Sequence, residues 1–439
     1  MFTVIGILII LLVVAFLLTG KGAPIIGLTL VPLIGALLAG FGADEIGRFY
    51  SEGLVKVMPV ATMFIFAIMF FGVMQDVGLF KPLIRTMLVL THGNVITVAI
   101  GTAVLGMVAH LDGAGATTFL LTIPALLPLY RKLRMSPYLM LMLLATGAGI
   151  FNMTPWAGPM GRASAVTGID VGALWRPLIP VQMIGVGLLL LFAAYLGQRE
   201  TRRIAAGTLG DAADGARTST HHSISQEDES LLKPRLIWVN CLIFVGVLAS
   251  LFTSILPAAY IFMIGLSLAL AINFPSLAAQ ADRIKAHAPN ALMMSTVILA
   301  AGTFLGIMDG SGMLKAMAKD LVNILPEPIV PHLHLILGIF GLPMELILST
   351  DAYYFGLLPI VQEVTSAYGV APTAVVYALI IGNIIGTFIS PFSPALWLAL
   401  GLANLEIGRH IRYSILRMWG FSLVLLVITI LFGRIPFVM

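Results

Sequence analysis

Two short polar segments interrupt hydrophobic runs in this chain, and each contains one aspartate. The first extends from His110 to Pro124 and places Asp112 between two apolar runs. A carboxylate at membrane depth costs roughly 2.5–3.5 kcal/mol on insertion scales, so such a residue usually lines an ion pathway or a ligand site. Small and hydroxyl-bearing neighbours are typical of a broken helix whose backbone faces a cavity. The neighbours of this kind are Gly113, Gly115, Thr117 and Thr118.

A second segment repeats this arrangement around Asp351, between Leu348 and Pro359. A capped loop between two spans would explain one such motif, but two matched copies favour a site. Tyr353 and Tyr354 either line that site or pack against the facing arm, and Glu345 is either a coupling acid or a residue at the mouth. The hydroxyl-bearing residues directly before the aspartate are Ser349 and Thr350.

Each aspartate motif is followed by a proline-containing interruption of a helix. Proline lacks the backbone donor of a helix interior and frees a carbonyl one turn earlier. At such a break an N-terminal half-helix end favours an anion, whereas unwound carbonyls favour a cation. A kink that serves packing alone is the alternative, but the polar side chains concentrated at both breaks favour function. The first break contains Asn152, Thr154, Pro155, Trp156 and Gly158; the second contains Asn383, Ser390 and Ser393.

Two further side chains near the first motif and the first break could act on a substrate. Arg162 either reaches toward the membrane interface or binds a carboxylate with its planar guanidinium. Gly161 and Ser164 leave room for a ligand beside it, which favours the carboxylate clamp. His110 either shares a proton with the nearby aspartate or is a buried histidine with satisfied hydrogen bonds.

The composition excludes most other classes of protein. Of 439 residues, 59% are hydrophobic and 10% are charged, whereas soluble domains average about 25% charged residues. This predicts an all-α polytopic membrane protein and excludes a soluble enzyme. The net charge of +4 comes from short loops, so no nucleic-acid partner is expected, and one cysteine, Cys241, excludes a disulfide framework. The sequence contains no HExxH, GxSxG or Cys/His cluster, so we expect neither an enzyme nor a cofactor.

The hydrophobic runs form two similar series, which predicts an internal repeat. Residues 72–81 parallel 306–315, residues 154–156 parallel 390–392, and residues 168–176 parallel 404–412. Such repeats are typical of secondary transporters, whose site lies near the membrane midplane. The first hairpin ends in three basic residues that the second lacks, so the positive-inside rule predicts inverted repeats. These basic residues are Arg131, Lys132 and Arg134.

These patterns predict two inverted repeats. The first repeat covers residues 1–197 with a re-entrant hairpin at about 110–130, and the second covers 236–439 with a hairpin at about 348–364. Residues 198–235 form a flexible cytoplasmic linker, in which His221 and His222 are expected to be solvated. Inversion needs an odd number of spans per repeat, whereas hydropathy gives six runs per half. We therefore expect eleven or twelve transmembrane helices, and prefer eleven, with one run near Pro257 that does not cross independently.

Two amphipathic helices are expected to lie at the membrane surface and to brace the moving part against the fixed part. They cover residues 80–90 and 314–325. Met1–Thr19 has no basic start and no small-residue cleavage pattern, so it is expected to be a retained first span.

Several motifs in this chain are more specific than an apolar composition alone and point to one family. They are residues 111–119, 125–130, 152–159, 162–164, 349–359 and 401–403, with His410 and Arg412. Together they resemble the citrate–metal:proton symporters, the CitMHS family of the ion transporter superfamily, from the first span nearly to the end of the chain. The resemblance implies proton-driven import of citrate complexed with Mg2+ or Ca2+. The superfamily also implies paired hairpins, scaffold and transport domains, an elevator motion and a homodimer.

The sequence differs from that family at three places in the motifs. Ala114 stands where a second acid is usual, Thr350 replaces an asparagine, and Asn383-Ile384 replaces a Gln-Pro pair. Fewer hard oxygen ligands weaken the case for a bound divalent ion and favour a more anionic or metal-free substrate.

We therefore expect a symporter in the inner (plasma) membrane, surrounded by lipid, that takes up citrate or a related di- or tricarboxylate, free or as a Mg2+ or Ca2+ complex. Hydroxyls, backbone N–H groups and Arg162 would bind the carboxylates. Asp112 and Asp351 would carry the coupling proton or cation, or contact a substrate-bound metal. A sodium-coupled transporter of a dicarboxylate or gluconate-like anion is the alternative, whereas a passive channel would not need two matched hairpins.

Overall fold

The computed structural model describes residues 2–19, 22–79, 82, 94–206, 231–253, 255–326 and 328–435, and they form helices joined by turns. The first half contains α1 (Phe2–Thr19), α2 (Pro24–Leu38), α3 (Ala43–Asp76), α5 (Val95–Ala109), α6 (Gly115–Lys132), α7 (Pro137–Phe151), α8 (Gly158–Thr167), α9 (Val171–Trp175) and α10 (Ile179–Ala205). The second half contains α11 (Ile237–Thr253), α12 (Ala258–Asn273), α13 (Leu277–Gly310), α14 (Met313–Ile324), α15 (Leu333–Ile339), α16 (Gly341–Met344), the π-helix η6 (Ala352–Leu357), α17 (Leu358–Ser366), α18 (Pro372–Asn383), the 3-10 turn η7 (Gly386–Phe388), α19 (Pro394–Ala403) and α20 (Ile407–Leu431).

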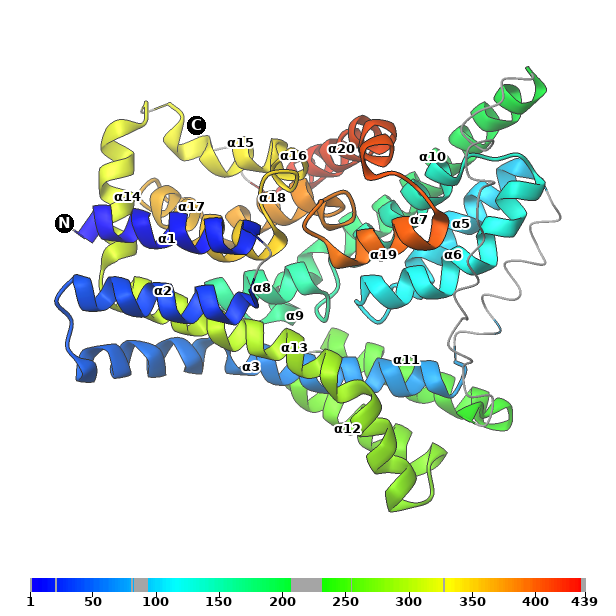
Figure 1. Ribbon diagram of the computed structural model, residues 1–439, viewed down its shortest axis with the longest axis horizontal. Helices are drawn as coiled ribbons and strands as arrows, with labels where there is room; N and C mark the ends of the chain where they lie inside the picture. Colours follow the sequence, from blue (N-terminus) through cyan, green and yellow to red (C-terminus); the bar gives the residue numbers. More distant parts are fainter. Residues whose placement is uncertain are drawn as a thin grey trace.

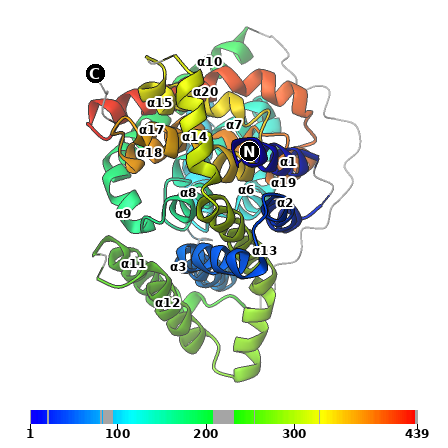
Figure 2. The same cartoon turned by 90° about the vertical axis from the view of Figure 1, so that its left-hand side faces the viewer.

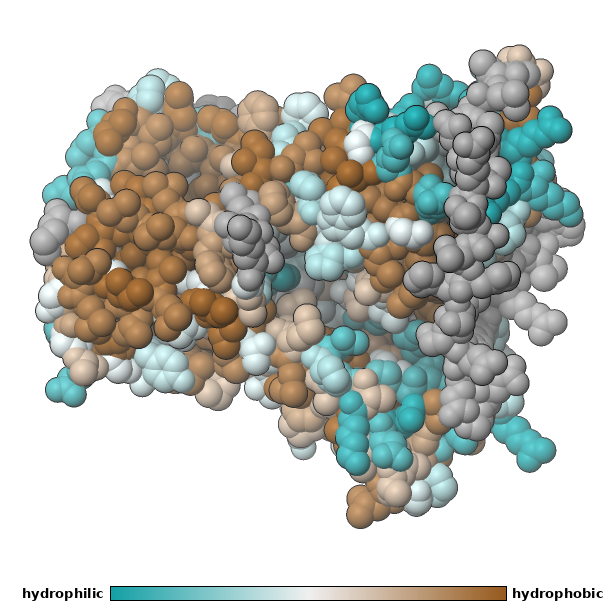
Figure 3. Space-filling view, in the orientation of Figure 1, coloured by the Kyte–Doolittle hydropathy of each residue, from teal (hydrophilic) through white to brown (hydrophobic). Residues whose placement is uncertain are grey.

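The helices confirm the predicted all-α membrane fold. Five helical stretches among the described residues are long and apolar enough to cross a membrane, and shorter apolar helices accompany them. Figure 3 shows a broad hydrophobic surface over α1 and α2, where exposed leucines and isoleucines gather, as expected of a surface that contacts lipid. Two separate helices, α11 and α12, lie on either side of Pro257 and pack against each other. The number of spans stays a prediction.

Two long helices in equivalent positions of the two halves, α3 and α13, form the most extensive helix pair. Glycines allow their backbones to approach: a Cβ on Gly53 would lie 2.1 Å from the carbonyl oxygen of Gly302. Near the other end of α3, a Cβ on Gly72 would lie 2.4 Å from His287 Nδ1, near the start of α13. The end of each helix therefore lies beside the start of the other, so α3 and α13 run antiparallel.

Ion pairs join α3 and α13 near both ends. Lys56 Nζ lies 2.7 Å from Asp309 Oδ2 at one end. At the other end His287 Nε2 lies 2.7 Å from Asp76 Oδ2, and Arg283 lies 3.3 Å from the same oxygen.

Each half also contains a helical hairpin followed by a broken helix. The first hairpin has arms α5 and α6, and the broken helix is α7 and α8; the second has α15–α16 and η6–α17 as arms, followed by α18 and α19. The predicted hairpin ranges, about 110–130 and 348–364, cover only the turn and the second arm of each. The first arms are apolar helices, and hydropathy alone does not distinguish such an arm from part of a span.

The helices form two layers. Figures 1 and 2 place α3, α11, α12 and much of α13 in one layer and the hairpins and broken helices in the other. The two hairpins come from opposite sides of the molecule in Figure 1, with α5 and α6 at the right and α15 and α17 at the left. Helix α8 contacts both α3 and α13, so the broken helix connects the two layers.

Three peripheral segments were predicted from local sequence, and the structure can be compared with these predictions. The amphipathic helix predicted at 314–325 is confirmed as α14, which buries Met313, Leu314 and Met317 and exposes Lys315 and Lys319. The other predicted amphipathic segment, 80–90, lies almost entirely outside the described residues, as do His221 and His222. Helix α10 continues to Ala205, into the segment predicted to be linker from residue 198, because the charged residues there still support helical turns.

Candidate functional site

The turn of the first hairpin lies against the first helix break. Asp112 Oδ1 accepts a hydrogen bond from the backbone N–H of Ala114 at 2.8 Å, which holds the turn in shape. Gly113 has a φ of +71°, and a Cβ there would lie 3.1 Å from the carbonyl oxygen of Trp156. Trp156 Nε1 donates to the carbonyl of Leu111 at 2.7 Å. The first aspartate is thereby fixed beside the break, and its side chain stays partly exposed.

His110 ends the first arm of that hairpin and connects three elements. Its Nδ1 lies 2.8 Å from the Thr118 hydroxyl, and its Nε2 lies 3.2 Å from Asn152 Oδ1. Asn152, which caps the end of α7, donates through Nδ2 to the carbonyl of Ile384 in the second break at 3.1 Å. The three polar side chains are buried, so of the two readings of His110 the structure favours the hydrogen-bonded buried histidine.

Glu345 has the corresponding place in the second hairpin. It follows α16 at the end of the first arm and is fully buried. Its Oε1 accepts from Asn383 Nδ2 at 2.8 Å, and its Oε2 accepts from the Thr350 hydroxyl at 3.3 Å. In both halves, therefore, a titratable side chain at the end of the first arm binds an asparagine of the broken helix and a threonine of its own hairpin.

An ion pair joins the second hairpin to the first broken helix. Arg162 Nε donates to Asp351 Oδ1 at 2.6 Å, and both side chains are largely buried, with exposed fractions of 11% and 17%. Arg162 lies in α8, and Asp351 directly precedes η6, which packs against α8. In this structure the predicted carboxylate clamp holds a carboxylate of the protein.

Helices begin at both breaks and at the turn of the first hairpin. Helices α6, α8 and α19 start at Gly115, Gly158 and Pro394 without side-chain capping bonds. Their first N–H groups therefore carry the partial positive charge of the helix start, which favours anions. Ser393 precedes α19, Ser390 accepts from the N–H of Phe392 at 3.3 Å, and Thr154 donates to the carbonyl of Phe151 at 2.7 Å.

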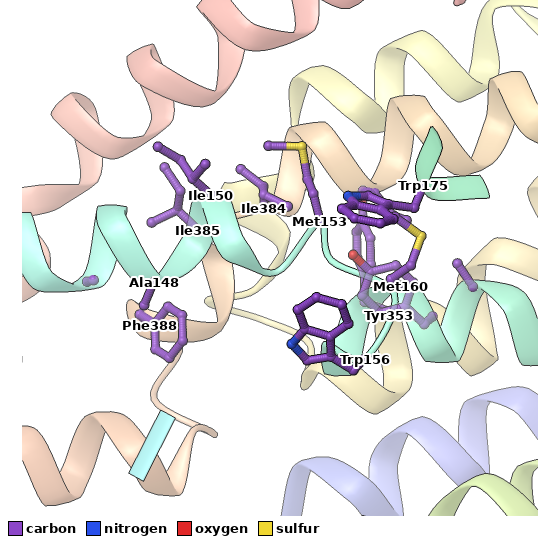
Figure 4. Packing of buried hydrophobic residues seen from close by; sticks show 14 of the residues in the cluster. Ala148, Ile150, Met153, Trp156, Met160, Trp175, Tyr353, Ile384, Ile385 and Phe388 are labelled. Carbon is purple, nitrogen blue, oxygen red and sulfur yellow. The ribbon is translucent and has the colours of Figure 1, made fainter. Parts of the chain in front are cut away.

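The two breaks pack against each other through apolar side chains. Figure 4 shows Ile384 and Ile385 beside Ile150, with Phe388 near Ala148. A Cβ on Gly149 would lie 2.8 Å from Ile385 Cγ1, and one on Gly115 would lie 2.8 Å from Phe388 Cε1. This close packing holds the two breaks at a fixed separation.

The remaining predicted residues lie around this framework. Pro155 borders a cavity of about 290 Å³ between the two layers, which Asp170 and Pro257 also line. The Tyr353 hydroxyl donates to the carbonyl of Leu379 at 3.3 Å, so this tyrosine packs against α18. Ser349 Oγ accepts from the N–H of Ala352 at 3.2 Å, and Thr117 donates to the carbonyl of Ala114 at 3.2 Å. Tyr354 is buried, and its hydroxyl has no hydrogen-bond partner among the described residues.

Of the two sequence-based interpretations of Glu345, its full burial favours the coupling acid over a residue at the mouth. Alignment of the two halves could have favoured the same interpretation, since Glu345 occupies the position of His110. No group of three or more metal-binding side chains occurs in the described part of the chain. Asp112 and Asp351, the residues predicted to contact a metal, bind Ala114 and Arg162 here.

Comparison with known proteins agrees with this architecture. Residues 1–382 match the CitMHS family, described as a citrate transporter. A "Citrate transporter" of Bacillus subtilis (strain 168) is 36% identical over all of both chains, and a "Mg(2+)/citrate complex secondary transporter" of the same organism is 34% identical over 94% of both.

Solved structures with similar folds are also membrane transporters. The YdaH transporter of Alcanivorax borkumensis has a TM-score of 0.59 at 18% identity over 90% of both chains. MtrF of Neisseria gonorrhoeae has a TM-score of 0.60 at 14% identity over 90% of this chain and 84% of its own. At such identities the likeness concerns the fold alone. The sequence relatives confirm a multi-pass transporter of the plasma membrane and not an enzyme, and the chain belongs to the CitMHS citrate transporter family.

Proposed function

We propose that this protein is a proton-coupled symporter that imports citrate, or a closely related di- or tricarboxylate, free or as a complex with Mg2+ or Ca2+. The observation that carries the proposal is the position of Arg162. It lies in α8 just after the first break, largely buried, and its partner is a carboxylate that a substrate carboxylate can replace. The two named citrate transporters among the relatives support the substrate class.

The substrate carboxylates would bind at the starts of helices α6, α8 and α19. The first N–H groups of α6, α8 and α19 lack side-chain caps and supply positive ends of helix dipoles. Arg162 would add a bidentate contact, which lysine cannot make in the same planar geometry. A substrate carboxylate on Arg162 would release Asp351. Substrate binding would therefore break the ion pair that joins the second hairpin to α8.

A metal ion would arrive as part of the substrate. The chain offers partly exposed oxygens at the first turn, where Asp112 and Thr117 lie, but no cluster of three protein ligands among its described residues. Mg2+ keeps several waters and binds through one or two carboxylates plus its substrate, which suits such a sparse set. We therefore assign Asp112 to the metal side of the complex and Asp351 to the exchange with Arg162.

Transport would proceed by movement of one layer against the other. Two cavities, of about 290 and 200 Å³, lie between the loop before α9 and the start of α12, and Asp170 and Ala258 line both. The antiparallel packing of the equivalent helices α3 and α13 supports inverted repeats, which in transporters expose one site alternately to the two sides. A homodimer joined through the α3, α11, α12 and α13 layer would keep that layer fixed in the membrane.

The test is uptake of labelled citrate into proteoliposomes under a pH gradient, a sodium gradient or neither, each with and without Mg2+ or Ca2+. We expect accumulation above the external concentration only with the pH gradient, and faster uptake with the divalent ion. Accumulation driven by sodium alone would instead establish the alternative, a sodium-coupled organic anion transporter. Citrate that only equilibrates under every gradient would contradict both.

A further inference from the structure

The coupling proton needs a binding site, and the described residues offer three acids around the two hairpin turns. Asp351 is bound to Arg162, which stabilises its charged form. Asp112 is partly exposed and accepts a backbone N–H, which also stabilises a carboxylate. Glu345 differs from Asp351 because it forms no ion pair with any described residue, and it differs from Asp112 because it is fully buried.

We propose that Glu345 is the residue that binds and releases the coupling proton. The proposal rests on the proton-coupled symport proposed above and identifies where in the protein the proton is held. The geometry behind it is a buried carboxyl group that binds Thr350, the neighbour of the aspartate that pairs with Arg162.

The immediate partners of Glu345 are neutral. Asn383 and Thr350 donate to its two oxygens at 2.8 and 3.3 Å. Neutral donors stabilise the carboxylate without fixing it permanently in the charged state, as a direct ion pair would. Both protonation states can therefore be reached within the same framework.

The positive charge of Arg162 lies near two acids, Asp351 and Glu345. The guanidinium of Arg162 is bound to Asp351, and the residue before Asp351, Thr350, donates its hydroxyl to Glu345. With both acids ionised the trio would carry a net negative charge in a buried place, which is costly. Protonation of Glu345 leaves the Arg162–Asp351 pair neutral overall. An arriving anion that draws on the charge of Arg162 would make a charged Glu345 less favourable still, so substrate and proton would bind together.

The other titratable groups near Glu345 do not replace this role. Tyr353 and Tyr354 from η6 are buried, and the Tyr353 hydroxyl donates to the carbonyl of Leu379. The elements packed against α16 carry further titratable or charged side chains. These are His334 on α15, Tyr377 on α18, and Arg409, His410, Arg412, Tyr413 and Arg417 on α20. His410, the buried histidine on α20, bonds to the carbonyl of Phe388 and the hydroxyl of Ser414, and none of the seven forms an ion pair or hydrogen bond with Glu345 among the described contacts.

The test compares Glu345→Gln with wild type in proteoliposomes. Glutamine has the same shape and can still accept from Asn383, but it cannot exchange a proton. We expect accumulation driven by a pH gradient to fall at least about tenfold, while citrate–citrate exchange and citrate binding persist and lose their pH dependence. The matched control is Glu406→Gln, because Glu406 is 72% exposed in its side chain and lies at the start of α20.

A second variant covers the case in which Glu345→Gln does not fold. Thr350→Val removes one donor and so disfavours the charged glutamate. We expect the pH of half-maximal uptake to move upward; an unchanged pH profile would overturn the assignment. Wild-type coupling retained by Glu345→Gln would overturn it equally while leaving proton-coupled citrate transport intact. Wild-type protein that shows no response to a pH gradient would refute the proposed symport itself, and this inference with it.

Discussion

Arg162 Nε donates to Asp351 Oδ1 at 2.6 Å, across the boundary between the first broken helix and the second hairpin. The two residues come from different halves of the chain and meet in a largely buried place. Removing one member of a buried pair typically costs about 3–5 kcal/mol, because the other charge is left without compensation. The pair therefore stabilises the hairpin against α8, and under the proposed function it would also hold the guanidinium where a substrate carboxylate binds.

Arg162→Lys separates these two roles. Lysine retains the charge that holds Asp351, but it loses the planar fork that binds a carboxylate in two places. We expect folded protein whose citrate concentration for half-maximal uptake rises about tenfold or more, a loss of about 1.4 kcal/mol. Arg176→Lys is the matched control, since Arg176 is exposed and follows α9. An unchanged half-maximal concentration in Arg162→Lys would show that the arginine does not contact the substrate.

Asp112→Asn tests the first turn. The asparagine oxygen can still accept from the N–H of Ala114, so the turn should keep its shape, but a ligand for the metal side of the complex is lost. We expect uptake of citrate with Mg2+ to fall about tenfold or more with the same pH profile, measured beside Asp282→Asn as an exposed control. A changed pH profile with an unchanged Mg2+ response would instead place the coupling proton at Asp112.

The sequence predicted the helix breaks and hairpin turns of this site, but it did not predict which side chains contact one another across the two halves. Prolines and glycines predicted the breaks, and the aspartate motifs predicted both hairpin turns. Nothing local to the sequence indicated that Arg162 binds Asp351, or that Asn152 reaches the carbonyl of Ile384, because these contacts join residues far apart in the chain. Glu345 was ambiguous for the same reason: its burial depends on how α16 packs against α18 and α20, which hydropathy does not describe.

The first residue of α8 controls the space around the arginine. A Cβ on Gly158 would lie 2.6 Å from Arg162 Nη1, so Gly158→Ala must displace the guanidinium. We expect weaker citrate binding, by about tenfold, with little loss of thermal stability, since the flexible end of the arginine side chain can move. The control is Gly187→Ala in α10, where a Cβ would meet no atom within 4 Å. Equal citrate affinity in the two alanine variants would mean that the position of the guanidinium does not limit binding.

Relative movement of the two layers can be tested at the smaller of the two cavities between them. Ile169, before α9, and Ala259, at the start of α12, line the same cavity of about 200 Å³ from opposite sides. The chain has one native cysteine, Cys241, so cysteines at positions 169 and 259 can be introduced into a Cys241→Ser background.

If the layers must move past each other, a cleavable bifunctional thiol reagent that joins these two cysteines should stop citrate uptake, and cleavage of the reagent should restore it. Each single-cysteine variant treated with the same reagent should keep its uptake, because one attachment does not join the layers. Full uptake by the completely cross-linked protein would mean that the substrate crosses without movement of α9 relative to α12, and the elevator proposal would be wrong.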